Sequence, residues 1–162
     1  MPHAHVFESY VASASKWLEQ LMTILEFPAG SEGRAVHALR AGLHAIRDRL
    51  PPSEVLDLGA QLPMIIRGIY FEGWTLTNDP TRIRDRAAMI ERVRRELRPD
   101  QLDPLDVLSA VIALLVDHVS RGELEDVVAT LPRSIASLWH ELAAHWTDVP
   151  QADAIRRTGY SQ

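Results

Sequence analysis

The sequence contains no cysteine and a single lysine, Lys16, and only 6% of its residues are aromatic. Without cysteine it can form no disulfide, and it has neither a thiolate nucleophile nor a cysteine ligand for zinc. No apolar run approaches the roughly 18 residues of a membrane-spanning helix; the longest, residues 107–116, is interrupted by Ser109. The N-terminus lacks the basic and apolar segments of a signal peptide. We therefore expect a cytoplasmic protein without a membrane segment.

The usual motifs of catalysis and cofactor binding are missing as well. The chain has no Gly-x-Ser-x-Gly, no Walker loop and no Gly-x-Gly-x-x-Gly. It also has no Glu-x-x-His pair, which a di-metal carboxylate bundle requires. A net charge of −5 disfavours a nucleic-acid partner, which usually needs a basic surface. These absences remove the usual reasons to propose an enzyme, and we expect no catalytic residues and no cofactor.

What the chain does contain is an internal repeat. Leu-Pro occurs at Leu62-Pro63 and again at Leu131-Pro132, 69 positions later. The same offset aligns Glu54 with Glu123, and it aligns two apolar stripes of helical spacing, in which Val36, Leu39, Leu43, Ile46 and Leu50 correspond to Leu105, Leu108, Ile112, Leu115 and Val119. Self-similarity at a fixed offset indicates a repeated structural unit. We therefore predict two similar halves, in which the central stripe residues Leu43 and Ile112 are buried.

Every periodic segment has the spacing of a helix, and none shows the sustained alternation of a β-strand. The first segment carries Phe7, Tyr10, Ala14, Trp17, Leu21, Ile24 and Leu25 at intervals of three and four residues. Proline and glycine separate this segment from those that follow. The predicted fold class is therefore an all-α bundle of about eight helices, with the two halves related by a pseudo-two-fold axis.

The ends of the predicted helices follow from capping residues and prolines. Ser31, Ser53 and Asp103 are suited to N-cap positions, and Ser120 with Glu123 has the spacing of a capping box. Because Pro63 cannot donate a helical hydrogen bond, we expect a new helix there, running to about residue 73, followed by a loop over residues 73–81.

The predicted domain organisation is simple. Residues 1–146 form a single helical domain made of two repeats, at about 7–74 and 82–146. A half of this size has too little core to be stable alone, so the two should fold as one unit. Residues 147–162 lose the apolar period, and we expect them to form a flexible tail.

Five sequence segments are specific enough to suggest a family. They are RDRLPPSEV, AQLPMIIRGIYFEGW (residues 60–74), PTRIRDR (80–86), GELEDVVATLP (122–132) and the pair Leu138-Trp139. Over about residues 7–139, the chain resembles the bacterial family known as domain of unknown function 2267. The resemblance implies a small, soluble, helical protein with two repeats and no established activity. It assigns no catalytic residue.

The histidines are the first candidates for chemistry. A zinc motif on a helix needs two histidines four residues apart, whereas His145 follows His140 by five. His37 and His44 share a helix face beside the apolar stripe, and His118 follows Asp117 next to the core position Val119. For these three histidines, packing at the edge of the core is the favoured interpretation over metal binding. We expect no metal site.

The residues that break the repeat are the second candidates. Under the 69-residue offset, Arg67 aligns with Ala136 and Trp74 with Ala143, so neither belongs to a duplicated folding requirement. Arginine with aromatic neighbours is typical of a recognition surface. The candidate surface comprises Arg67, Tyr70, Trp74, Arg82, Arg84 and Arg86. The alternative is structural: Trp74 would anchor the linker between the halves, and Arg67 would cap a helix C-terminus.

Two hypotheses of function follow. The first is a non-enzymatic module that presents this arginine and aromatic surface to a protein or to a small anionic ligand. The second is a metal-binding protein or an enzyme that uses His37, His44 or His118 at the interface between the halves. The sequence identifies neither the ligand nor the oligomeric state.

Overall fold

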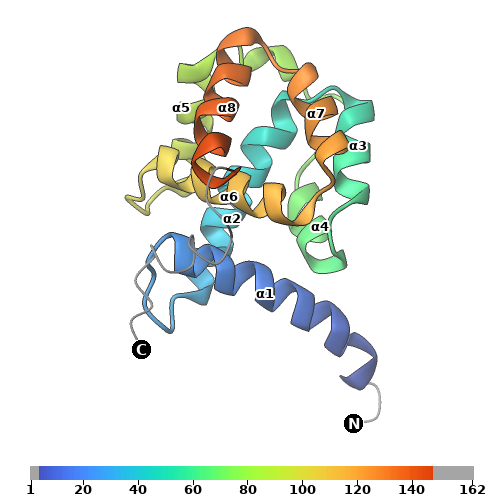
Figure 1. Cartoon of the computed structure of the whole chain (residues 1–162), viewed down its shortest axis with the longest axis vertical. Helices are drawn as coiled ribbons and strands as arrows, with labels where there is room; N and C mark the ends of the chain where they lie inside the picture. Colours follow the sequence, from blue (N-terminus) through green and yellow to red (C-terminus); the bar gives the residue numbers. More distant parts are fainter. Residues whose placement is uncertain (1–3, 148–162) are drawn as a thin grey trace.

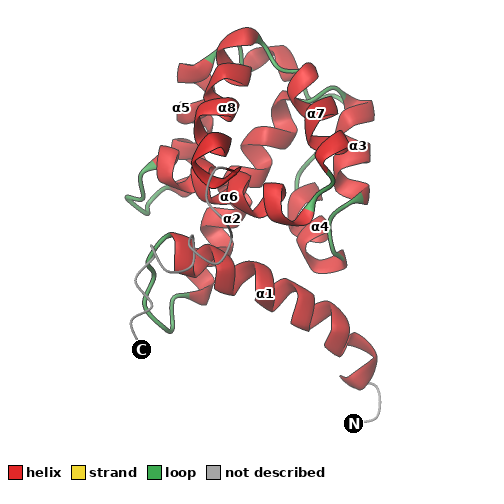
Figure 2. Ribbon diagram, viewed as in Figure 1, coloured by secondary structure: helices red, strands yellow, loops and turns green. Residues whose placement is uncertain are grey.

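The computed structural model describes residues 4–147, and these are helical without any strand (Figure 2). The elements are η1 (Ala4–Phe7), α1 (Glu8–Ile24), α2 (Glu32–Arg49), α3 (Pro52–Ala60), α4 (Met64–Phe71), η2 (Pro80–Arg82), α5 (Arg86–Leu97), α6 (Pro104–His118), α7 (Arg121–Ala129) and α8 (Arg133–Thr147). The predicted all-α bundle is confirmed. The predicted flexible tail lies, apart from Thr147, outside the described residues.

Helices α2 and α6 form the centre of the bundle. Helix α2 packs against α1, α4, α5 and α6, and Figure 1 shows it passing through the middle of the molecule. Leu43 and Ile112, the central residues of the two apolar stripes, are both buried as predicted. Of the ten stripe positions, Val36 and Leu105 at the helix beginnings are half-buried and the other eight are buried. The helical spacing therefore identified the core correctly.

The two halves use matching contacts. Within the first half, α1 packs on α2 and α4, and α4 packs on α2 and α3; within the second half, α5 packs on α6 and α8, and α8 packs on α6 and α7. Between the halves, α2 contacts α5 just as α6 contacts α1. Helices α3 and α7 keep the 69-residue offset at both ends. These correspondences support the predicted repeat, and the superposition of the halves stays a prediction.

Helices α2 and α6 approach each other closely at Gly42. A Cβ atom built on Gly42 would lie 2.5 Å from Cγ2 of Val111, a distance that real Cβ atoms do not tolerate. Glycine is therefore required here by the close approach of the two helices. Val111 is also the residue that corresponds to Gly42 under the 69-residue offset. The crossing thus brings two corresponding positions into contact.

Several helix ends differ from the predicted capping. Asp103 caps α6 as expected, accepting a hydrogen bond from the Leu105 amide at 2.8 Å. Ser31 occupies the N-cap of α2 but makes no side-chain capping bond. The prediction for Ser53 is wrong, because α3 begins at Pro52 after Pro51 as N-cap. Proline at the first helical position needs no capping partner for its missing N–H, so α3 starts earlier than the serine suggested.

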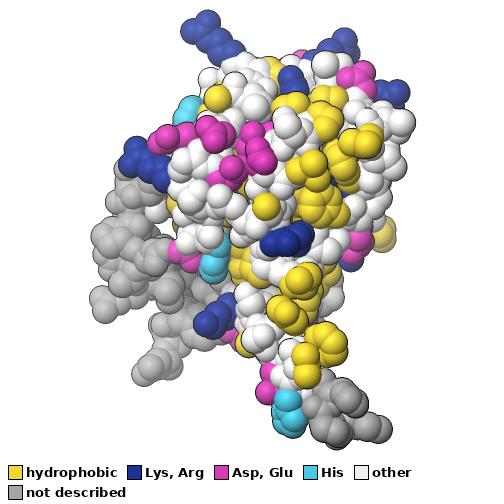
Figure 3. Space-filling view, turned by 90° about the vertical axis from the view of Figure 1, so that its right-hand side faces the viewer, with side chains coloured by type: hydrophobic (Ala, Val, Ile, Leu, Met, Phe, Trp, Pro, Cys, Tyr) yellow, Lys and Arg dark blue, Asp and Glu magenta, His cyan; other side chains and the backbone are white. Residues whose placement is uncertain are grey.

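The beginning of α1 projects from the body of the protein (Figure 1). Ala14, Trp17 and Leu21 are buried, but Phe7 and Tyr10 at the other end of the same apolar stripe are exposed by 60% and 40%. Hydrophobic side chains follow this projecting end in Figure 3. The helical period was therefore correct for α1, and only the second part of its apolar stripe is buried.

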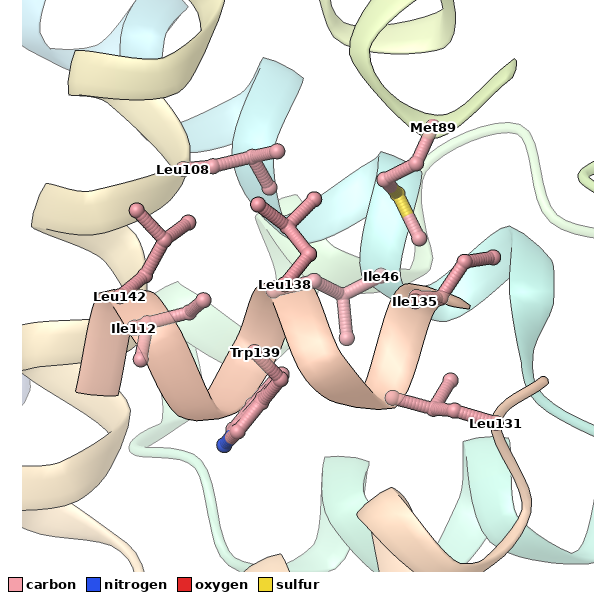
Figure 4. Close-up of a pocket in the computed structure, with 9 residues that line it drawn as sticks. All are labelled: Ile46, Met89, Leu108, Ile112, Leu131, Ile135, Leu138, Trp139 and Leu142. Carbon is pink, nitrogen blue, oxygen red and sulfur yellow. The ribbon is translucent and has the colours of Figure 1, made fainter. Parts of the chain in front are cut away.

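A small apolar cavity lies between α2, α5, α6 and α8 (Figure 4). Its volume is about 20 Å³, and its walls are the side chains of Ile46, Met89, Leu108, Ile112, Leu131, Ile135, Leu138, Trp139 and Leu142. A water needs two to four polar partners to be stable in such a space, and this lining offers almost none. The cavity is too small for a ligand, so a binding site has to be sought at the surface. Within residues 4–147, no helix is long and apolar enough to span a membrane.

Candidate anion-binding cleft

A large polar cleft opens between α2, α5 and the segment of residues 72–82 that joins the two halves. Its volume is about 880 Å³. The lining residues are mostly charged or hydroxylated: Arg40, His44, Arg47, Asp48, Glu72, Gly73, Trp74, Thr75, Thr77, Asn78, Arg82, Arg92, Arg95 and Glu96. Helix α2 supplies four of them from one face, at the spacing that places residues three and four apart side by side.

Arg47 attaches the joining segment to α2. Its side chain is only 3% exposed, and Nη1 donates to the backbone carbonyls of Tyr70 and Glu72 at 2.7 Å each. Nε donates to the Asp48 carboxylate at 2.9 Å. These carbonyls belong to the end of α4, where the helix leaves its last C=O groups unpaired. Arg47 therefore fixes the path of the chain that forms one wall of the cleft.

Asp48 and Arg92 join α2 to α5 at the base of the cleft. Arg92 donates from Nη2 to Asp48 at 2.9 Å and from Nη1 to Glu96 at 2.6 Å. The backbone carbonyl of Asp48 accepts from Asn78 Nδ2 at 3.1 Å, which holds the joining segment as well. The Arg92–Asp48 ion pair therefore joins α5 to α2, and the hydrogen bond from Asn78 attaches the joining segment to the same end of α2.

His44 completes this network. It is 5% exposed, its Nδ1 lies 2.6 Å from Glu96 Oε1, and its Nε2 lies 2.7 Å from the carbonyl oxygen of Ile69. A carbonyl can only accept, so Nε2 carries a proton. Nδ1 faces the Glu96 carboxylate at hydrogen-bonding distance. His44 thus acts as a donor that orients Glu96, and both of its nitrogens are occupied.

The network keeps Glu96 ionised. Burial would raise the pKa of Glu96, but the hydrogen bonds from His44 and Arg92 outweigh burial and hold this pKa below its usual value. Burial likewise opposes the charge of Arg92, and its carboxylate partners Glu96 and Asp48 raise the pKa of Arg92 in return. The base of the cleft is therefore a set of fixed charges at neutral pH.

The rim of the cleft, formed by Arg40, Arg82 and Arg95, carries the excess positive charge. Arg40 pairs with Glu72 at 3.0 Å. Arg82 and Arg95 are exposed and form no ion pair with any residue in the described range. Five arginines and three carboxylates line the cleft, which leaves two positive charges in excess.

Trp74 adds a donor without an acceptor. The indole is half-buried and packs edge to face on Phe71 at 6.1 Å between ring centroids. Its Nε1 is buried and has no hydrogen-bond partner among residues 4–147. A buried donor left unpaired costs free energy.

The structure separates the six residues of the predicted surface. Trp74 and Arg82 line the cleft, and the other four do not. Arg67 donates to the carbonyls of Ala60 and Leu62 at 2.9 Å each, which caps the end of α3. Tyr70 is fully buried, and its hydroxyl donates to the Val55 carbonyl at 2.8 Å. Arg67 therefore makes the helix-capping contact that was the alternative to recognition, and Tyr70 is used inside the fold.

The remaining arginines lie at the start of α5. Arg86 forms an ion pair with Glu141 of α8 at 2.9 Å, and Arg84 is exposed outside the cleft. Helix α5 begins only at Arg86, where the Asp85 carboxylate caps the Ala88 amide at 2.9 Å. Arg82 and Arg84 thus precede the helix, and Arg86 occupies its first position.

The histidines do not converge. His37 lies 3.0 Å from the Leu97 carbonyl, whereas His118 stacks on Trp17 with 4.6 Å between ring centroids and contacts Gln20. Burial lowers the pKa of His118, partly offset by Asp117. In the part of the chain that the structure describes, no group of three or more His, Asp or Glu residues could hold a metal ion.

Arg40 and Arg47 of the cleft were not among the residues singled out from the sequence, and His44 was singled out only as a histidine at the interface between the halves. The repeat nevertheless contains a signal for all three. Under the 69-residue offset, Arg40 aligns with Ser109, His44 with Ala113 and Arg47 with Val116. A polar or charged side chain in one half therefore corresponds to a small or apolar one in the other, which is the asymmetry that also marks Trp74.

Comparison with known proteins agrees with the resemblance seen in the sequence. The model of the family described as "Uncharacterized conserved protein (DUF2267)" matches residues 14–138. The chain belongs to this family. No curated protein matches the chain. The match spans the core helices and the joining segment, and therefore includes the whole cleft. The family itself carries no assigned activity.

Proposed function

We propose that this DUF2267 protein is a non-enzymatic binding module whose cleft takes a small anionic ligand. The single observation that carries the proposal is the excess of arginine over carboxylate in the cleft, with Arg82 and Arg95 at its rim lacking an ion-pair partner within residues 4–147. Exposed cations in a concave site attract and orient an anion, because the surrounding protein concentrates their field. A cytoplasmic location, as the sequence suggested, is part of the proposal.

The chemistry of the lining indicates what such a ligand would need. Arginine presents several N–H donors in a planar fork that matches carboxylate and phosphate oxygens. Thr75 and Thr77 add hydroxyl groups, and Trp74 adds an unsatisfied indole N–H. The ligand class is therefore a small carboxylate or phosphate compound with several acceptor oxygens. The carboxylates of the network are already paired with His44, Arg47 and Arg92, so the anion does not have to compete with them for Arg82 and Arg95.

The proposal can be tested by following the indole N–H signal of Trp74 in a ¹H–¹⁵N spectrum. The full chain is titrated with inorganic phosphate and separately with citrate, and sodium chloride at matched ionic strength serves as the reference. We expect a saturable shift of the Trp74 signal with at least one of the two anions. Arg82→Gln and Arg95→Gln should each weaken the affinity about tenfold or more, since one charge-assisted hydrogen bond contributes about 1.5–3 kcal/mol.

Arg94→Gln is the matched control. Arg94 is the neighbour of Arg95 on α5, but it is exposed outside the cleft and pairs with Glu91 at 2.8 Å. This variant removes the same charge from the same helix and should bind as the wild type does. Equal weakening by Arg94→Gln would mean that only net charge matters. Absence of a saturable shift with both anions would contradict a small-anion site and leave a protein with acidic side chains as the candidate partner.

A further inference from the structure

Two glutamates meet where α3 packs against α7. Glu54 belongs to α3 and is 8% exposed, and the half-buried Glu123 belongs to α7. Each carboxyl group has a buried Oε1 atom without a hydrogen-bond partner within residues 4–147, and the interaction of Glu54 with Glu123 raises the pKa of Glu123. The two residues correspond to each other under the 69-residue offset. Two acidic side chains therefore face each other across the contact between the halves.

The position of Glu123 differs from the capping box that the sequence predicted. Ser120 does accept from the Glu123 amide, at 3.3 Å. The second bond of a capping box would run from the Ser120 amide to the Glu123 side chain. That amide instead donates to Gln61 Oε1 at 3.0 Å. The Glu123 carboxyl is thus released from capping and turned toward Glu54.

No cation neutralises this pair among the described residues. Each glutamate has a buried Oε1 atom without a hydrogen-bond partner. The ionisable groups that face the pair are Asp57 of α3, Asp126 of α7 and Tyr70 of α4, none of which is cationic. Three arginines lie on the elements packed against the pair: Arg67 of α4, Arg121 of α7 and Arg133 of α8. Arg67 and Arg121 bind other groups, and within residues 4–147 none of the three forms an ion pair with either glutamate. Burial lowers the pKa of His118 on α6, which disfavours its charged form.

We propose that Glu54 and Glu123 share one proton across the contact of α3 with α7, and that release of this proton loosens the contact. With the proton bound, the O–H of one carboxyl group donates to the carboxylate of the other, which satisfies both orphan oxygens. When water takes the proton, two carboxylates remain face to face in a partly buried space. Two like charges that face each other disfavour the closed arrangement of α3 and α7. We call the pair of Glu54 and Glu123 the proton latch.

The electrostatics of the site agree with this geometry. Burial, followed by the hydrogen bond and the charge of Glu54, raises the pKa of Glu123 to about 8. In the unfolded chain the pKa of Glu123 has its ordinary value of 4.5. Between pH 4.5 and about 8, the folded protein therefore binds more protons than the unfolded chain does. Stability therefore falls as the pH rises through this interval and levels off above about pH 8. The latch operates in the neutral to mildly alkaline range.

Loosening should stay local. The other polar link between α3 and α7 is the pair formed by Gln61 and Ser120, with Gln61 Nε2 3.1 Å from Ser120 Oγ, and neither side chain titrates. The contact of α2 with α5 rests on ion pairs such as that of Arg92 with Asp48, which stay charged over the same range. A rise in pH thus acts on one helix pair and leaves the centre of the bundle closed.

The proton latch can be tested by ¹³C spectra of the glutamate side-chain carboxyl groups, followed from pH 4 to 10 in the full chain. We expect one glutamate carboxyl to titrate near pH 8 in the wild type. In Glu54→Gln, the midpoint of Glu123 should fall toward its ordinary value of 4.5, because the neighbouring carboxyl is gone. Spectra of Glu123→Gln should lack the alkaline titration.

Hydrogen exchange measures whether the contact of α3 with α7 loosens. After correction for intrinsic rates, the amides of α3 and α7 should exchange about tenfold faster at pH 8.5 than at pH 6.5 in the wild type, while the amides of α2 keep their protection. Glu123→Gln should abolish this difference. Glu125→Gln is the control, because Glu125 lies on the same helix but is exposed and paired with Arg121; it should respond as the wild type does.

Two results would overturn the proposal. One is a wild-type spectrum in which every glutamate titrates below pH 6, which requires no variant to fold. The other is a normal alkaline titration without any change in the exchange of α3 and α7, since the proton would then be shared but would not hold the contact.

Discussion

Replacement of Gly42 by alanine tests the packing at the centre of the bundle. In an ordinary helix interior this change is stabilising, because alanine has a helix propensity about 1 kcal/mol better than that of glycine. At Gly42, however, the new methyl group would lie 2.5 Å from Cγ2 and 3.0 Å from Cβ of Val111. Overpacking of a well-packed core costs about 1–3 kcal/mol. We therefore expect a net destabilisation of about 0–2 kcal/mol, opposite in sign to the effect of propensity.

The measurement is urea denaturation followed by far-ultraviolet circular dichroism, with Gly68→Ala as the matched control. Gly68 lies inside α4, and a Cβ built there would meet nothing within 4 Å. The control should gain about 0.5–1 kcal/mol from propensity alone. The difference between the two variants in the free energy of unfolding isolates the steric effect at Val111.

A double variant decides whether the clash is the cause. Val111→Ala removes both γ-methyl groups, so Gly42→Ala should be tolerated in its presence, with a favourable coupling of at least about 0.5 kcal/mol between the two changes. The reasoning is refuted if Gly42→Ala stabilises the protein as much as Gly68→Ala does. It is also refuted if the two changes at Gly42 and Val111 are additive, because the residues would then not interact.

Two further predictions use the same measurement. Leu43→Ala and Ile112→Ala should each lower the free energy of unfolding by about 2–5 kcal/mol through lost transfer energy and a cavity, and values below about 1 kcal/mol at both would contradict their burial. Arg67→Ala should cost about 1.5–3 kcal/mol, since it removes charge-assisted hydrogen bonds to the end of α3; a loss within about 0.5 kcal/mol would indicate an ordinary surface residue.

The sequence predicted those parts of the fold that depend on local pattern. Apolar spacing located the helices, and proline separated them, since both act within one or two turns. The ends of the helices were predicted less accurately. Ser53 was a plausible N-cap, yet the N-cap of α3 is Pro51, two residues earlier. The apolar stripe of the first segment is continuous through Phe7 and Tyr10, but no other element within residues 4–147 buries them. A period shows which face is apolar and does not show how far the rest of the protein extends along it.

The cleft could be predicted only in part, because its residues meet through contacts between distant segments. His44 and Glu96 are 52 positions apart, and Arg92 is 44 positions from Asp48. No spacing rule connects such pairs. The sequence did identify Trp74 and Arg82 through their lack of a counterpart in the other half. It could not distinguish them from Arg67, which is equally asymmetric but turns toward the carbonyls of α3.

The proton latch and the crossing at Gly42 both join positions that correspond to each other in the repeat that we propose. A pseudo-two-fold axis would bring residues close to it against their own counterparts under the 69-residue offset. At the crossing of α2 with α6 the counterparts are Gly42 and Val111, and a second valine in place of Gly42 would collide. At the contact of α3 with α7 the counterparts are Glu54 and Glu123, two identical side chains that repel each other when both are charged. A bound proton removes the repulsion between the two glutamates, just as glycine at position 42 avoids the clash with Val111. The pair of glutamates makes the contact of α3 with α7 depend on pH. The cleft lies away from these contacts and is present once, because Arg40, His44 and Arg47 have no charged counterparts in the other half.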